Sequence, residues 1–185
     1  MHKIPCFLLK DKQAFEIDGL RLCGEPIALC KKLFDQGAKL IHIIDTNAIK
    51  GVNSNLDVYD KLTYFVNIEV EAAPKKEILS KLISLRSRIV ISDFSNDAFA
   101  ALFDYSQNKN LLVAKINCSI FNWTDSKLFD RVLDFFDEIY FSGSVSLSVL
   151  TKATKLKKRV ILNQSVYKNL KNKKELKIFG LIMDS

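Results

Sequence analysis

The chain has 185 residues, 48% of them hydrophobic and 26% charged, with a formal net charge of +7. This length suits one domain, and we predict that residues 1–185 form a single one. The composition excludes an intrinsically disordered chain, and the lack of any apolar run of about 18 residues excludes a membrane-spanning helix.

Short apolar runs alternate with amphipathic stretches along the chain, which is typical of repeated β-α units around a parallel sheet. We predict eight strands, at 4–9, 40–45, 64–70, 88–92, 111–117, 138–141, 159–162 and 178–183. Between them we predict helices at 26–34, 55–61, 75–85, 96–105, 125–136, 146–154 and 164–170. Pro26 suits the start of the first of these helices, and Gly37 suits its end.

Eight parallel strands with intervening helices predict an α/β fold, a (β/α)8 TIM-type barrel. Because the chain ends after the last strand, we expect a shortened barrel that lacks a final helix. An open, doubly wound sheet is the alternative, since the length suits it better. However, no strand is followed by a GxGxxG or GxxxxGK loop, and we therefore also predict no cofactor.

Three segments carry a family resemblance: IPCFLLKD at 4–11, EPIALCKKLFDQGAKLIHIID at 25–45, and the continuation TNAIKG at 46–51. They resemble the first strand, the first helix with the second strand, and the following loop of a family of histidine-biosynthesis barrels. This family contains ProFAR isomerase and imidazole-glycerol-phosphate synthase. The resemblance covers roughly the first 60 residues and implies a TIM-type barrel related to isomerases.

Residues that the family uses for chemistry differ here. The resemblance implies a general acid and a general base at the ends of the first and fifth strands, but Leu8 and Asn117 occupy these positions. It also implies phosphate-binding glycine loops after the third, fourth, seventh and eighth strands, and these glycines are absent. We therefore expect ProFAR isomerase activity to be lost, and the catalytic residues, if any, are unknown.

Polar side chains recur at or near the predicted strand ends, where TIM barrels build their active sites. They form the candidate pocket and are Asp45, Glu69, Asp93, Asn117, Ser142 and Asn163, with Asp184 after the last strand. Convergent carboxylates could bind an organic ligand or a divalent metal, or they could cap the following helices. We predict no metal site.

Two further features bear on the site. His42 lies inside the second predicted strand, and we expect it to be hydrogen-bonded and to face the helices. Phe121-Asn122-Trp123 follows the fifth strand and either covers a ligand pocket or staples the next helix.

The four cysteines form no CxxC pair, and the N-terminus lacks the features of a signal peptide, so we expect a cytoplasmic protein. Lysine dominates the basic segment 152–177, and few aromatic residues are interleaved there. We interpret this segment as a solvated face, not a nucleic-acid site, and expect no membrane association.

We therefore favour a barrel of the ProFAR isomerase type that has lost its chemistry and binds a small molecule or a protein partner. The alternatives are an enzyme of changed chemistry that uses Asp45, Glu69 and Asp93, a residual isomerase, or an interaction module. An uncovered last strand would also favour a homo-oligomer.

Overall fold

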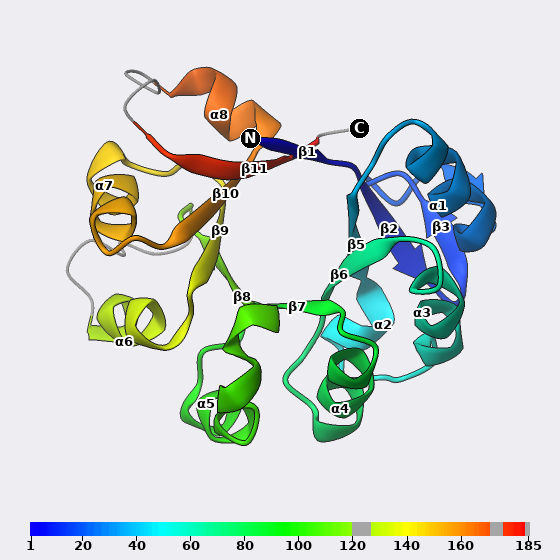
Figure 1. The fold of residues 1–185 in the computed structure, drawn as a ribbon, viewed down its shortest axis with the longest axis horizontal. Coiled ribbons are helices and arrows are strands. Elements are labelled where there is room, and N and C mark those ends of the chain that lie inside the picture. The colour runs from blue at the N-terminus through cyan, green and yellow to red at the C-terminus, as the bar shows by residue number, and fades with distance from the viewer. Residues whose placement is uncertain (120–126, 171–175, 184–185) are drawn as a thin grey trace.

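A computed structural model describes residues 1–119, 127–170 and 176–183. One curled, mostly parallel sheet of 11 strands runs through the molecule, and helices cover its outer face (Figure 1). The strand order is β1-β11-β10-β9-β8-β7-β6-β5-β2-β3-β4.

The elements follow the predicted order closely. The strands are β1 (His2–Ile4), β2 (Cys6–Lys10), β3 (Gln13–Phe15), β4 (Leu22–Gly24), β5 (Leu40–Asp45), β6 (Asn67–Glu71), β7 (Arg88–Ile91), β8 (Leu112–Asn117), β9 (Glu138–Ser142), β10 (Arg159–Asn163) and β11 (Ile178–Ile182). The helices are α1 (Pro26–Asp35), α2 (Thr46–Ile49), α3 (Leu56–Leu62), α4 (Lys76–Ser84), α5 (Asn96–Phe103), the 3-10 helix η1 (Ser106–Leu111), α6 (Lys127–Phe135), α7 (Leu147–Lys155) and α8 (Gln164–Asn169).

Each of the eight predicted apolar runs overlaps a strand, and each predicted helical stretch overlaps a helix. The third run starts later than predicted, at Asn67, because residues 63–66 complete the turn after α3. The antiparallel hairpin β3–β4 was not predicted, and neither were α2 and η1.

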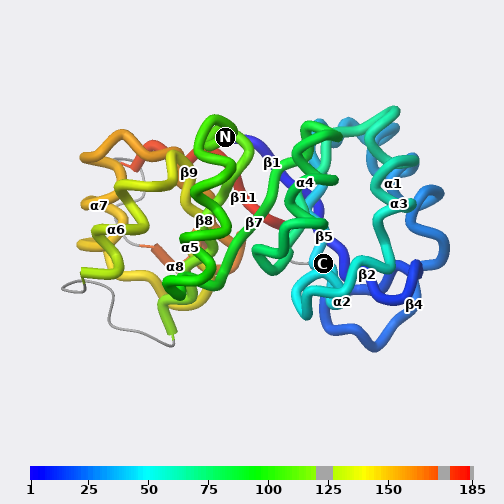
Figure 2. Tube along the Cα trace, turned by 90° about the horizontal axis from the view of Figure 1, so that it is seen from below, coloured from blue at the N-terminus to red at the C-terminus, as the bar shows by residue number. Residues whose placement is uncertain are grey.

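The first predicted strand is divided at Pro5 into β1 and β2, and each half has a different neighbour. β1 pairs in parallel with β11, whereas β2 pairs in parallel with β5. Figure 2 shows the N-terminal strand beside β11, the last strand of the described chain. Residues 2–10 therefore lie between the second and the eighth predicted runs.

Side chains alternate between two apolar layers, as strand geometry requires. The larger layer lies between the sheet and the helices and contains Ile41, Ile43 and Ile68 among many others. The smaller layer lies on the concave inner face and consists of Ile4, Val90, Val113, Tyr140, Ile161 and Ile182. Among the described residues, no helix is both long enough and apolar enough to span a bilayer.

Candidate functional site

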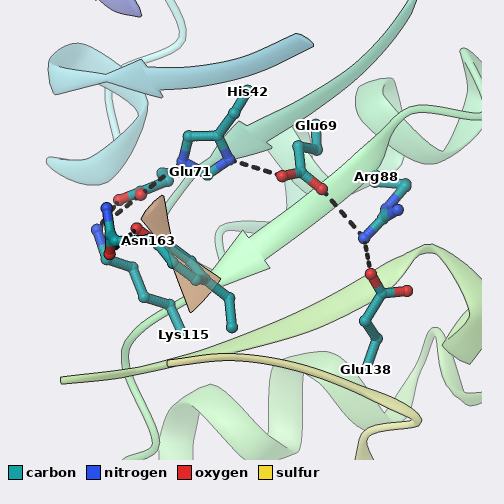
Figure 3. A network of polar contacts seen from close by, with 8 residues as sticks. His42, Glu69, Glu71, Arg88, Lys115, Glu138 and Asn163 are labelled. Carbon is teal, nitrogen blue, oxygen red and sulfur yellow. Dashed lines mark hydrogen bonds and ion pairs between the residues drawn. The ribbon is translucent and has the colours of Figure 1, made fainter. Parts of the chain in front are cut away.

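A chain of charged side chains crosses the inner face of the sheet (Figure 3). His42 lies at its centre on β5, and β6 places Glu69 and Glu71 beside it. The Nδ1 atom of His42 is 2.8 Å from Oε1 of Glu69, and its Nε2 atom is 2.9 Å from Oε1 of Glu71. The imidazole thus has a carboxylate partner at each nitrogen. Because all three side chains are buried, it has little access to water.

The network continues in both directions from the two glutamates. Glu69 Oε2 lies 3.0 Å from Nη2 of Arg88, which also forms an ion pair with Glu138. Glu138 Oε2 lies 3.1 Å from Nη2 of Arg159. On the other side, the Lys115 ammonium donates to both oxygens of Glu71, at 2.6 and 2.7 Å. Cations and carboxylates thus alternate from β8 through β5 to β10.

This alternation sets the protonation of the buried groups. Burial alone lowers the pKa of His42, but the hydrogen bonds to Glu69 and Glu71 and their charges raise it to about 9. Burial raises the pKa of both glutamates, but bonding to His42 and the neighbouring cations together lower it below the usual range. At neutral pH His42 is therefore an imidazolium that donates from both nitrogens.

Burial dominates at Glu138, and its pKa is raised although Arg88 and Arg159 favour the charged form. Glu138 belongs to the part of the network that lies toward the amino ends of the strands. Arg88 and Arg159 are likewise the first residues of their strands, so this part of the network lies at the amino edge of the sheet.

A pocket of about 330 Å³ opens at the carboxyl ends of β5, β9, β10 and β11, and we call it the mouth pocket. Its lining residues are Cys6, Glu16, Ile17, Asp18, Ile44, Tyr140, Asn163 and Ile182. The Tyr140 hydroxyl donates a hydrogen bond of 2.9 Å to Asn163 Oδ1. The ring of Tyr140 meets His42 edge-on at 5.6 Å, and Lys115 Nζ lies 5.5 Å from its centroid. Tyr140 thus links the mouth pocket to the charged network.

The six predicted site residues are divided between several environments. Asn163 lines the mouth pocket, and Glu69 lies in the charged network. Asp93 and Asn117 are exposed, and their side chains accept hydrogen bonds from the backbone of Ser95 and Ser119.

Asn117 and Ser142 are register partners on β8 and β9. They lie beside a second pocket of about 430 Å³ between helix α8 and the loops that follow β8 and β9, which is lined in part by Ser119, Gly143 and Ser144. Asp184 and Phe121-Asn122-Trp123 lie outside the described residues.

Asp45 has a structural environment. Its Oδ1 accepts hydrogen bonds of 2.8 Å from the backbone N–H groups of Asn47 and Ala48, which caps α2. Its Oδ2 accepts from Asn55 Nδ2 at 2.8 Å and from the Tyr59 hydroxyl. With four donors and no exposure, this carboxylate has no free position for a ligand.

We expect Asp45→Asn to lower the free energy of unfolding by about 2 kcal/mol, because the new amide cannot accept all four hydrogen bonds. Urea unfolding monitored by circular dichroism measures the change. Asp93→Asn is the matched control, since Asp93 also accepts a backbone hydrogen bond two residues ahead but is exposed. Equal effects of the two substitutions would contradict a special role for Asp45.

The prediction that His42 faces the helices is wrong, although its hydrogen bonding is confirmed. His42 contacts Glu69, Glu71 and Tyr140 on the inner face, while its neighbours Ile41 and Ile43 face the helices. The inner-face network was not predicted either. Its signal was charged residues at alternate positions within apolar strands, as in Glu69 and Glu71 of 67–71. Within the described ranges, no group of three or more His, Cys, Asp or Glu side chains is arranged to hold a metal ion.

Two archaeal proteins are similar to this chain, and both are the phosphoribosyl imidazole-4-carboxamide isomerase known as ProFAR isomerase. The protein from Nitrosopumilus maritimus is 37% identical over 70 residues, which are 36% of this chain and 30% of that protein. The protein from Methanocaldococcus jannaschii is 38% identical over 92 residues, 44% of this chain and 38% of that protein. The chain therefore resembles ProFAR isomerase, and the match spans only about a third of these relatives' length. No family model matches the chain.

Solved structures support the fold class alone. Two crystal structures of dihydropteroate synthase from Thermus thermophilus, one in complex with 4-aminobenzoate, superpose with TM-scores of 0.55 and 0.56. Both superpositions cover 98% of this chain, and they cover 86% and 87% of the synthase chains. The sequence identities are 8% and 9%.

Proposed function

We propose that this chain forms a (β/α)8 barrel of the ProFAR isomerase type that binds a small organic molecule in the mouth pocket and does not isomerise ProFAR. The strand pairing supports closure of the barrel. β1 and β2 are separated only by Pro5, and they pair with β11 and β5. The two residues at the junction of β1 and β2 also form backbone hydrogen bonds to the neighbouring segments on opposite sides. The carbonyl oxygen of Pro5 accepts from His42 N on β5, and that of Ile4 accepts from Met183 N after β11.

The observation that carries the loss of isomerisation is the pair of side chains at the two positions where the family resemblance implies the acid and the base. Leu8 lies on β2 in register with Ile44, and Asn117 is the last residue of β8. An alkyl group and an amide cannot exchange a proton near neutral pH, so general acid and base catalysis would need other groups.

The mouth pocket supports a retained binding function. Its volume of about 330 Å³ is at the lower end of the range for small-molecule sites, and apolar walls surround a few polar groups. An enzyme built on Asp45, Glu69 and Asp93 is less well supported. Asp45 is saturated with hydrogen bonds, and Asp93 is exposed and lines neither pocket described above.

Two measurements test the proposal. With ProFAR as substrate, we expect no turnover above the uncatalysed rate and no heat of binding in calorimetry. In a thermal-shift screen of polar metabolites, we expect a compound that raises the melting temperature of the wild-type protein. ProFAR turnover would overturn the loss of isomerisation.

A filled pocket provides the structural control. Ile17→Trp places a large ring at the rim, and we expect it to abolish the thermal shift. Leu20→Trp is the matched variant, because Leu20 is in the same loop but is 87% exposed and does not line the pocket. A ligand whose effect survives Ile17→Trp would bind elsewhere, which would contradict binding at the mouth pocket.

A further inference from the structure

The mouth pocket has an uneven distribution of charge. Its walls are the aliphatic side chains of Ile17, Ile44 and Ile182, and its polar groups include Tyr140 and Asn163. Glu16 and Asp18, from the loop between β3 and β4, are its only charged lining residues. The pocket thus carries negative charge in a protein whose net charge is +7.

Both carboxylates are available to a ligand. Glu16 is half-buried, and its ion pair with Arg21 is long, at 3.3 Å, with the Arg21 side chain 78% exposed. Such exposed ion pairs contribute little to stability, typically less than about 1 kcal/mol. Asp18 accepts a hydrogen bond from Leu20 N through Oδ1, which leaves Oδ2 as an acceptor.

The cations beneath the pocket do not offset this negative charge. Lys115 is near Tyr140, but Glu71 binds its ammonium with both oxygens (Figure 3). The imidazolium of His42 lies between two carboxylates. A ligand anion would therefore meet carboxylates at the rim and cations that are already paired.

We infer that the mouth pocket binds a small organic cation, of the amine or amidine class, with an apolar body that fits between the isoleucines. The inference deepens the proposed function and rests on it. Glu16 and Asp18 accept hydrogen bonds from the cationic group, and the apolar body packs on Ile44 and Ile182. Phosphorylated ligands are disfavoured because their charge has the same sign as the rim.

Three isosteric probes separate charge from shape: benzamidinium, benzamide and benzoate. Their dissociation constants are measured by calorimetry at low salt. We expect benzamidinium to bind at least about tenfold more tightly than benzamide, and benzoate to bind most weakly. In the double variant Glu16→Gln/Asp18→Asn, we expect the preference for benzamidinium over benzamide to fall below about threefold. Asp93→Asn is the control, and the preference remains unchanged there.

Equal binding of benzamidinium and benzamide, tighter binding of benzoate, or no binding of benzamidinium at millimolar concentration would each overturn the inference. The proposed function is tested separately. If neutral or anionic compounds from the metabolite screen bind and Ile17→Trp abolishes their effect, the pocket is a ligand site but its preference for cations is wrong. If no compound of any charge binds, the proposed function fails as well.

Discussion

Replacing His42 with leucine should lower the free energy of unfolding by about 3–5 kcal/mol, because it removes one partner from a buried charged network. The substitution conserves much of the volume, so the loss reflects the carboxylates and not a cavity. Glu69 would keep Arg88, and Glu71 would keep Lys115, but each would lose its hydrogen bond to the imidazole. Urea unfolding at pH 6.5 measures the difference in stability.

His2→Leu is the matched control, because the other histidine of the chain is exposed on β1. We expect a change of less than about 1 kcal/mol there. If His42→Leu does not fold, the variants Glu71→Gln and His42→Gln give a graded series that retains polar side chains. A loss below about 1 kcal/mol in His42→Leu would mean that the network does not depend on the imidazolium.

The alternation of apolar runs and amphipathic stretches was enough to predict the eight strand regions and the helices between them. The reason is that the side chains on the helix-facing side of each strand are apolar and buried. Val160 and Leu162, for example, lie in the outer layer of β10. Pro5 was visible in the first run, but its effect on pairing was not predicted. A proline has no N–H to donate, and here it separates two halves of one strand that pair with different neighbours.

The hairpin β3–β4 escaped prediction because each strand has only three residues. The tight turn that leads into it uses Asp11 and Lys12 at positive φ instead of the glycine that normally marks such a turn. This hairpin matters for the proposed function, since the loop that follows β3 supplies Glu16, Ile17 and Asp18 to the mouth pocket. No strand-end rule could place these residues there.

The candidate site was predicted from strand ends, and this criterion selected residues by position without regard to the face of the sheet. Asp45 follows the helix-facing Ile43 by two positions and therefore lies on the same face. All acceptor positions of its carboxylate are occupied, by backbone N–H groups at the start of α2 and by side chains at and within α3. His42, Glu69 and Glu71 share the other face, and the alternation of side chains along β5 and β6 contains this information.

The stability of the protein should fall as the pH rises from about 6.5 through about 9. The folded state raises the pKa of His42 from its ordinary value of 6.5 to about 9. A raised pKa contributes stability that is complete below the unfolded value and is lost as the pH passes the folded one. The shift corresponds to roughly 3 kcal/mol. Glu69 and Glu71 have lowered pKa values, so their contribution is lost on the acid side, below their ordinary value of 4.5.

The summed contribution of His42, Glu69 and Glu71 to the free energy of unfolding is therefore expected to be largest between about pH 4.5 and 6.5. Urea unfolding at pH 6.5 and 9.5 measures the loss in the wild-type protein, and His42→Gln should lack most of it. A direct measurement uses His2→Ala, which leaves His42 as the only histidine for a nuclear magnetic resonance titration. A midpoint near 9 is the expected result, because deprotonation would leave two buried carboxylates facing a neutral ring that has only one N–H to donate. A midpoint below 6.5 would instead mean that burial dominates and that the ring is neutral at pH 7. The ring could then donate to only one of the two glutamates, and the other would need a proton of its own to form its hydrogen bond to the ring.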